Sequence, residues 1–432
     1  MSARTRNQIV QRPRRSPTRS KGLQSAQSSH LEGSAEMDAP APLLVPRVRL
    51  KNYKSIATCD VSLRSLTFLV GPNGSGKSNF VDGLRFVADS LRTSLDHALR
   101  DRGGIKEVRR RSGGHPTHFE IRLDLNIGSE SGHYAFRVGA KKKGGFEVQQ
   151  EECVIGGNSY VVRSGKVTTS SVKTPPAAAS DRLYLVNASG LREFRPVYDA
   201  LSSMGFYSLN PTQIRDLQSP DPGKLLLREG GNIASVLDQL SMHATSTKNR
   251  IEEYLAKVVP GIVGVDTRVV GPKETLEFRQ RVAGAKDPWH FFAANMSDGT
   301  LRALGVLVAI FQSANGTRVP LVAIEEPEIA LHPAAAGVLR DSLRDASRIT
   351  QLLVTSHSPD LLDDESFAPE TLLAVDAIDG ASVIGSLDQA GITALKKNLY
   401  TPGELLRMNQ LTPNLAAVPR PETDRDLFDF SE

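Results

Sequence analysis

The stretch "LTFLVGPNGSGKSNF", residues 66–80, decides the fold class. Its first five residues form an apolar run that predicts a buried strand, and the spacing of Phe80, Leu84 and Val87 predicts a helix over 77–92. The segment between them fits the pattern G-x-x-x-x-G-K-[ST]. In that pattern backbone N–H groups surround a phosphate, the lysine reaches the β- and γ-phosphate oxygens, and the hydroxyl coordinates Mg²⁺. The predicted nucleotide site comprises Gly71, Pro72, Asn73, Gly74, Ser75, Gly76, Lys77, Ser78 and Asn79.

Two kinds of periodicity surround this phosphate loop. Strict apolar alternation over 119–127 and 134–138 predicts an antiparallel β lobe at about 115–165. Helical spacing in the region 210–260 predicts a helical insertion, and two short apolar runs follow at 321–324 and 352–355. Short apolar runs that alternate with helices favour a parallel sheet covered on both faces. The predicted fold class is therefore α/β, a P-loop NTPase with a mostly parallel core sheet flanked by helices.

The two ends of the chain are expected to be tails. Seven basic residues precede the first acid, Glu32, in a segment rich in Ser, Gln and Pro, so 1–45 is predicted to be a disordered basic tail. Such an arm can hold nucleic acid by neutralising phosphates, or it is a solvated leader, and the sequence leaves both open. Residues 46–400 are assigned to the ordered head and 401–432 to a C-terminal tail.

Composition predicts the compartment. The chain has 432 residues, a net charge of +5 and two cysteines, too few for a disulfide framework, so a reducing cytoplasm is expected. The longest apolar stretch, 303–311, is too short to cross a bilayer, so no membrane role is expected.

Two carboxylates follow the apolar run at 321–324. In a doubly wound sheet, ligands bind at the carboxyl ends of the strands, so Glu325 is the candidate Mg²⁺ ligand and Glu326 the candidate base for an attacking water. His357 follows the next apolar run, and its place predicts a bond to the γ-phosphate or to that water. Glu326, His357 and Lys77 are the predicted catalytic residues.

A second glycine-centred helix start lies at 297–300. Ser297 is a good N-cap, and an apolar stripe follows it through Leu301, Leu304 and Val308. A capped helix end can bind an anion, which suggests a γ-phosphate sensor made of Ser297, Asp298, Gly299 and Thr300. An ordinary capped helix explains the segment equally well when it is taken alone.

The order "GPNGSGKS", "MSDGT", "IEEPE" and "TSHSP" resembles the ABC-type ATPase heads of the SMC/RecF/OLD group, and the resemblance covers about 46–400. It implies ATP and Mg²⁺ as cofactors, and a dimer in which Ser297 and Gly299 complete the ATP site of the partner molecule. It also implies that Gln213 senses Mg²⁺. Tyr53 lies where some relatives stack an aromatic ring on adenine, although a core tyrosine is as good an explanation.

The sequence departs from its relatives in several places. Ser-Asp-Gly-Thr at 297–300 differs from the transporter motif, and Glu325 stands where many heads have aspartate, which implies slow turnover. No arm of SMC length is present, and too few residues follow "TSHSP" for a TOPRIM nuclease.

The leading functional hypothesis is an ATP-dependent homodimer that acts on DNA in repair or anti-phage defence. Phosphate contacts would come from Lys106, Arg109, Arg110, Arg111 and 141–143, although each run is also typical of a solvated face. The alternative is a sensor or scaffold subunit that regulates a separately encoded effector such as a nuclease. A transporter ATPase is the third and least favoured hypothesis.

Overall fold

The computed structural model describes residues 43–112, 116–313, 319–419 and 427–429. Contacts divide the chain into a unit at 1–39 and a compact unit at 40–432, and every described residue belongs to the second. The predicted basic tail therefore lies outside the described residues except for 43–45, where Leu44 and Val45 are already buried.

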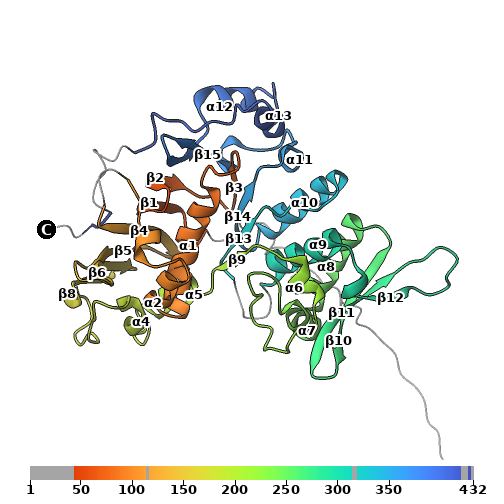
Figure 1. Cartoon of the computed structure of the whole chain (residues 1–432), viewed down its shortest axis with the longest axis horizontal. Helices are drawn as coiled ribbons and strands as arrows, with labels where there is room; N and C mark the ends of the chain where they lie inside the picture. The colour runs from red at the N-terminus through yellow and green to blue at the C-terminus, as the bar shows by residue number, and fades with distance from the viewer. Residues whose placement is uncertain (1–42, 113–115, 314–318, 420–426, 430–432) are drawn as a thin grey trace, which may run out of the picture. The chain divides into compact units, whose positions relative to one another are not determined.

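A mixed sheet of 13 strands organises the described chain (Figure 1). Its parallel part has the order β15-β3-β14-β13-β9. These strands are β3 (Leu66–Val70), β9 (Gly205–Tyr207), β13 (Leu321–Glu325), β14 (Gln351–Ser356) and β15 (Leu372–Ile378). Strand β16 (Ala381–Ser386) pairs antiparallel with β15 and parallel with β2, and so joins this part to the remaining strands. The α/β P-loop prediction is confirmed, with the refinement that the parallel strands occupy one end of a larger mixed sheet.

The antiparallel lobe continues the same sheet in the order β8-β7-β6-β5-β4-β1-β2. Its alternating side chains pack one face into a core, as the period of two dictates. The strands are β1 (Arg47–Tyr53), β2 (Ile56–Ser62), β4 (His118–Ile127), β5 (Glu130–Ala140), β6 (Phe146–Ile155), β7 (Asn158–Arg163) and β8 (Lys166–Ser170). The lobe thus includes β1 and β2, which precede the phosphate loop in sequence.

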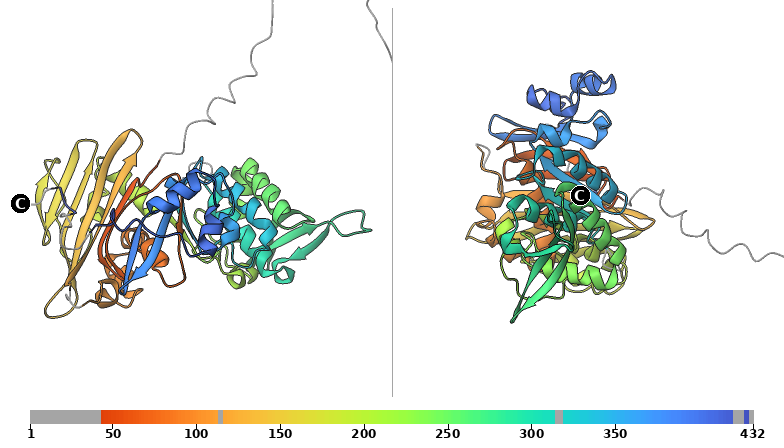
Figure 2. Two further views of the ribbon diagram at one scale, coloured as in Figure 1. Left: turned by 90° about the horizontal axis from the view of Figure 1, so that it is seen from above. Right: turned by 90° about the vertical axis from the view of Figure 1, so that its right-hand side faces the viewer.

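The two faces of the parallel strands carry different helices. Leu69, Ala323 and Leu353 point into a cluster with α1 (Lys77–Arg92), whereas their neighbours Phe68 and Val354 point into a second cluster with α9 (Asp298–Phe311). Figures 1 and 2 show α1 and α9 on either side of β3, β14 and β13. The phosphate-loop helix and the Ser297 helix therefore cover opposite faces of one sheet.

Several further helices complete the two layers. Helices α2 (Leu95–Arg100) and α5 (Arg195–Ser202) contact α1, while α3 (Ile105–Val108) contacts α2 and α4 (Tyr184–Ala188) contacts α5. The α9 side adds α6 (Pro211–Arg215), α7 (Ile233–His243), α8 (Thr245–Val258) and α10 (Ala336–Ala346). A three-stranded antiparallel sheet that the sequence analysis did not predict follows α8, with strands β10 (Ile262–Val270), β11 (Lys273–Gln280) and β12 (Trp289–Phe292).

The segment assigned to the C-terminal tail begins with ordered structure. Helix α13 (Pro402–Arg407) begins with a capping box between Thr401 and Glu404, and it packs on α11 (Pro359–Leu362). Leu405 and Leu411 are buried. The short helix escapes periodicity analysis because six residues hold fewer than two turns. Helix α12 (Gln389–Lys396) precedes it.

None of the helices in the described ranges is long and apolar enough to cross a membrane.

Candidate active site

The phosphate loop connects β3 to α1 through residues 71–76. Gly76 caps α1 with a left-handed φ of 108°. A Cβ atom at this position would lie 1.8 Å from Ser382 Oγ, so glycine is required both by the backbone conformation and by space. The loop is therefore fixed against β16 as well as against its own helix.

Lys77 points back into the loop. Its Nζ donates hydrogen bonds to the carbonyl oxygens of Gly71 at 2.8 Å and Pro72 at 3.0 Å. Burial lowers the pKa of Lys77, and the carboxylates of Glu326 and Glu328 act against that shift. The ammonium group thus lies between the loop carbonyls and the acidic turn after β13.

The residues of the loop fit a bound phosphate and Mg²⁺. The hydroxyl of Ser75 is buried and has no hydrogen-bond partner among the described residues, while the Ser78 side chain is exposed. The first N–H groups of α1 have no acceptor within the helix, which is the arrangement that binds phosphate in P-loops. Asn79 donates to Ser55 Oγ at 2.6 Å, which in turn lies 2.6 Å from Ser382 Oγ.

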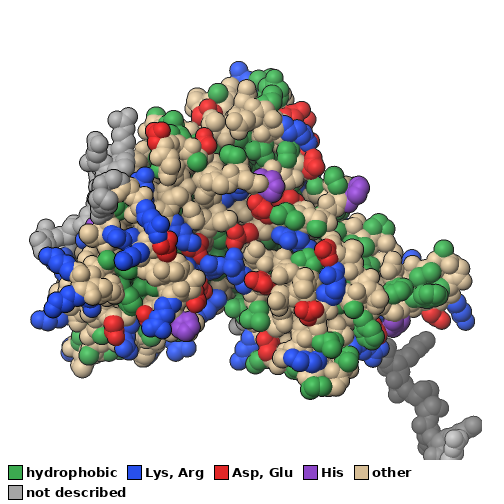
Figure 3. Space-filling model, in the orientation of Figure 1, with side chains coloured by type: hydrophobic (Ala, Val, Ile, Leu, Met, Phe, Trp, Pro, Cys, Tyr) green, Lys and Arg blue, Asp and Glu red, His purple; other side chains and the backbone are tan. Residues whose placement is uncertain are grey.

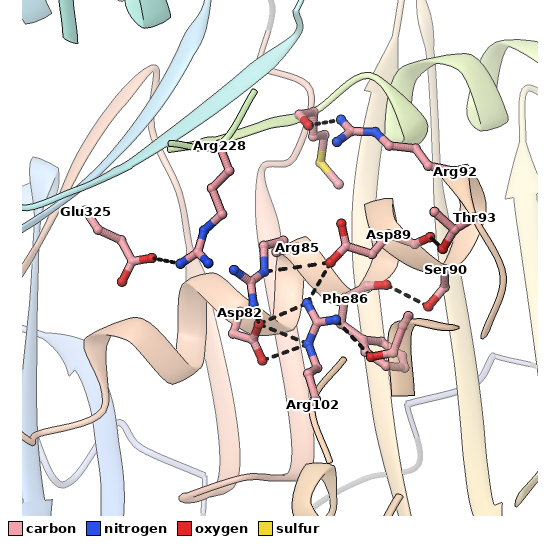
Figure 4. Close-up of polar contacts among 12 residues, drawn as sticks. Asp82, Arg85, Phe86, Asp89, Ser90, Arg92, Thr93, Arg102, Arg228 and Glu325 are labelled. Carbon is pink, nitrogen blue, oxygen red and sulfur yellow. Dashed lines mark hydrogen bonds and ion pairs between the residues drawn. The ribbon is translucent and has the colours of Figure 1, made fainter. Parts of the chain in front are cut away.

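A buried ionic network supports the second turn of α1 (Figure 4). Asp82 accepts from Arg85 and Arg102, and Lys54 Nζ lies 2.6 Å from its carboxylate. These cations hold the pKa of Asp82 well below its usual range, against the effect of burial. Arg102 also lies over the Phe86 ring, so α1 is held by charge and packing together.

Tyr53 contributes to the network that holds α1 and does not line an adenine site. Its hydroxyl donates to Asp82 Oδ2 at 2.8 Å, and its ring is fully buried against Phe86 and Phe119. Of the two explanations for this tyrosine, the core residue is correct.

The carboxyl ends of β13 and β14 bring Glu326 and His357 together. Glu325 pairs in register with Thr355, and Glu326 N donates to Thr355 O at 3.0 Å and to its Oγ1 at 3.2 Å. Glu326 has a left-handed φ of 47°, an unusual conformation for a glutamate that this turn maintains. His357 Nδ1 lies 3.1 Å from Glu326 Oε1, within ion-pair distance but without hydrogen-bond alignment. Two of the predicted catalytic residues are therefore neighbours.

Two charged residues that the sequence analysis missed also lie here. Glu328 accepts from Ser356 Oγ at 2.7 Å, and burial raises the pKa of its carboxyl. Arg228 Nη2 lies 3.2 Å from Glu325 Oε1 (Figure 4). The third acid of "EEPE" was a signal that pointed to Glu328. No sequence pattern pointed to Arg228.

Residues 297–300 begin α9 on the opposite face. Ser297 caps the helix by accepting from Thr300 N at 3.2 Å, and its side chain is exposed, as is that of Asp298, which pairs with Arg215. A Cβ atom on Gly299 would lie 2.5 Å from the carbonyl oxygen of Ala330. The start of α9 is thus anchored to the turn that follows Glu326, and Ser297 and Asp298 face outward.

Gln213, the predicted Mg²⁺ sensor, is exposed on α6. Within the described ranges its side chain makes no hydrogen bond to Ser78 or Glu325, and Arg228 is the residue that reaches Glu325. The role of Gln213 stays a prediction.

Comparison with known proteins assigns the chain to a family. A family model described as "AAA domain, putative AbiEii toxin, Type IV TA system" matches residues 66–363, more than half of the chain. The chain belongs to this family. This AAA-domain protein is 24% identical over 359 residues to the OLD nuclease of Thermus scotoductus, covering 78% of this chain and 63% of the nuclease. It is 26% identical over 235 residues to the chromosome partition protein Smc of Methanococcus voltae, covering 50% of this chain and 18% of Smc. The chain therefore spans less than two thirds of the length of either relative.

A solved structure has the same fold. An Smc head bound to the C-winged helix domain of ScpA matches with a TM-score of 0.53 and 16% identity, covering 81% of this chain and 99% of that one. Together with the family match and the OLD relative, this fold supports the predicted resemblance to ABC-type ATPase heads of the SMC/OLD type.

Proposed function

We propose that the protein binds Mg·ATP at the phosphate loop and hydrolyses it in a dimer of two such heads. Lys77 and the N–H groups of the loop would bind the β- and γ-phosphates, and Ser78 and Glu325 would hold the metal. Bound Mg²⁺ would neutralise charge that develops on the phosphate oxygens. Glu326 would accept the proton of the attacking water, with His357 beside it to orient that water.

The observation that carries the dimer proposal is the placement of α1 and α9 on opposite faces of the parallel strands. A phosphate at the start of α1 is served by the loop and by the acidic turn of the same chain. Ser297 lies at the start of the other helix and is exposed, with its hydroxyl engaged only in its local cap among the described contacts. An exposed helix N-terminus of this kind suits the γ-phosphate of a second molecule.

We propose DNA as the target of the dimer, in repair or in anti-phage defence. Figure 3 shows many Lys and Arg side chains over the antiparallel lobe, and Lys141, Lys142 and Lys143 are exposed in the turn between β5 and β6. Basic side chains bind nucleic acid by releasing counterions from its phosphates. The names of two relatives, a nuclease and a chromosome partition protein, favour the same target.

The test is a mixing experiment with two defective variants. Ser297→Asp keeps a good N-cap but places a negative charge where the partner's γ-phosphate would bind, and Lys77→Ala removes the phosphate lysine. If sites are shared, a mixed dimer contains one site with an intact loop and an intact Ser297. ATP turnover of the mixture should then rise well above the sum of the two variants measured alone.

The matched control is Ser297→Asn, which caps the helix and adds no charge. It should retain most of the turnover that Ser297→Asp loses. A mixture no more active than its separate components, at concentrations where the parent protein is active, would contradict the shared-site arrangement.

A second candidate function is regulation of a separately encoded effector. Three large apolar side chains next to α13, Leu399, Tyr400 and Met408, are exposed, which is a feature of protein-binding surfaces. A Cβ atom on Gly403 of α13 would lie 2.4 Å from Pro359 O, two residues after His357. A partner bound there would sense the state of the ATP site. ATP turnover that does not respond to double-stranded DNA would favour this candidate over a dimer that acts on DNA.

A further inference from the structure

Arg228 is the one cation that contacts the candidate metal carboxylate in the described part of the chain. Its Nη2 lies 3.2 Å from Glu325 Oε1, and its side chain is 45% exposed against 22% for the glutamate (Figure 4). The residue comes from the loop between α6 and α7, far from Glu325 in sequence.

The backbone around Arg228 is firmly held. Ser208 N, just after β9, donates to Arg228 O at 3.1 Å, and Asn210 N donates to Glu229 O at 3.1 Å. On the other side Leu227 N donates to Asn232 Oδ1 at 2.8 Å. Because β9 is the neighbour of β13, these bonds fix the backbone of Arg228 at the carboxyl edge of the parallel strands. The backbone is therefore held in place, while the partly exposed guanidinium can change its position.

The ion pair at Glu325 conflicts with metal binding. The carboxylate can hold Mg²⁺ directly or through water, but a guanidinium bonded to its Oε1 repels a divalent cation and occupies a lone pair that the metal would use. Loading of the site therefore displaces the guanidinium. The nearest anion would then be the end of the triphosphate beside Glu326, and the planar fork of arginine suits phosphate oxygens.

We propose that Arg228 is a phosphate-sensing residue with two positions, on Glu325 in the empty site and on the γ-phosphate of Mg·ATP in the loaded site of the same chain. This inference rests on the proposed function. It adds a residue that distinguishes ATP from ADP within one head, whereas Ser297 would do so across the dimer. Arg228 would thus report the γ-phosphate to α7 through its own loop.

The experiment measures equilibrium binding of ATP and ADP over a Mg²⁺ titration. It uses full-length protein carrying Glu326→Gln, which is expected to keep ATP intact, with and without Arg228→Ala or Arg228→Lys. Arg268→Ala is the matched control, since Arg268 is another exposed arginine paired with a glutamate, at 2.8 Å from Glu277 on the three-stranded sheet. Thermal unfolding of each variant checks that the fold is kept.

Arg228→Ala should weaken ATP binding by about tenfold and ADP binding by about twofold or less, because a charge-assisted bond to the γ-phosphate is lost. It should also lower the Mg²⁺ concentration needed for half-maximal ADP binding, because Glu325 is freed. Arg228→Lys should recover part of the ATP affinity, and Arg268→Ala should change neither quantity.

An unchanged ratio of ATP to ADP affinity in Arg228→Ala, with normal binding by the parent protein, overturns this inference alone. Failure of the parent protein to bind ATP, or equal binding by its Lys77→Ala variant, overturns the proposed function and this inference with it.

Discussion

The two helices that flank the parallel strands carry their candidate functional groups in different ways. At the start of α1, Gly76 is held against Ser382 and Lys77 is buried with two hydrogen bonds to its own loop. At the start of α9, Ser297 and Asp298 are exposed, and the described bond of Ser297 is its local cap. The first site is built within one chain, and the second presents its groups outward.

Glu326 lies between these two regions. Its side chain faces His357, while its carbonyl oxygen accepts from Arg302 of α9 at 3.1 Å. Four residues later, Ala330 touches Gly299, and both Glu326 and Ala330 have left-handed φ values. The difference between the two helices suggests that phosphate is bound by one side and sensed by the other, with the turn at 326–330 as the connection.

The largest expected effect concerns this connection. Glu326→Gln should reduce the ATP turnover number by about a thousandfold, because a positioned general base contributes on the order of 10²–10⁴. ATP binding should persist, because the amide adds no repulsion toward the phosphates. Steady-state turnover and equilibrium binding measured on the same preparation check both parts. Turnover within threefold of the parent protein would mean that another group accepts the proton.

Lys77→Ala tests directly whether the starts of the two helices act in different ways. Loss of the ammonium group should weaken Mg·ATP binding by about a hundredfold, the upper range for a charge-assisted hydrogen bond. Because the loop belongs to one chain, this loss should be the same at every protein concentration. Ser297→Asp should leave binding to dilute protein unchanged and act only at concentrations that support a dimer. If both variants weaken Mg·ATP binding equally in dilute protein, the start of α9 serves the ATP site of its own chain and the proposed difference between the two helices is contradicted.

The candidate site at the start of α1 could be located from the sequence because its parts follow one another closely along the chain or lie directly after strands. A strand, a glycine loop and a helix follow one another in 66–92, and Glu326 and His357 each follow a strand end directly. Parallel neighbours place such ends at one edge, so proximity follows from chain order. The contact of Arg228 with Glu325 could not be predicted in this way, because it depends on β9 lying beside β13. Local periodicity does not indicate the lateral order of strands in a sheet.

The other omissions have similar causes. Strands β10 and β12 carry exposed apolar residues such as Val269 and Trp289, so their alternation does not separate a buried face from a solvated one. Helix α13 holds six residues, and its capping box is a contact between Thr401 and Glu404 that outlines no apolar stripe. The dimer and the identity of the nucleotide as ATP were inferred from the resemblance to known ATPase heads, because sequence periodicity indicates neither of them.

The antiparallel lobe, which shares a core cluster with α1, also holds a buried acid on β6, Glu151, whose titration should affect stability. Glu151 accepts from Tyr160 at 2.9 Å and from Leu185 N at 2.8 Å, and burial raises its pKa to about 7. A raised folded-state pKa means that the folded protein binds the proton more tightly than the unfolded chain. The free energy of unfolding should therefore fall as pH rises from about 4.5 to about 7, by about 3 kcal/mol.

Urea unfolding at pH 5 and pH 8 measures this change. Glu151→Gln should remove most of it, while the exposed Glu130→Gln should leave it in place. A pH slope that survives Glu151→Gln would place the titrating group elsewhere in the protein.

The smallest expected effect tests how tightly α9 is tied to the acidic turn. Gly299→Ala would place a Cβ atom 2.5 Å from Ala330 O, so either the first turn of α9 or the turn at 326–330 must shift. Overpacking of this kind costs about 1–2 kcal/mol of unfolding free energy. Gly337→Ala on α10 is the control: its nearest atom would be Arg340 Nη2 at 3.8 Å, and alanine in a helix should stabilise by about 0.5–1 kcal/mol. If the shift reaches Glu326, Gly299→Ala should also lower turnover, whereas loss of stability with full turnover would show that α9 and the acidic turn move independently.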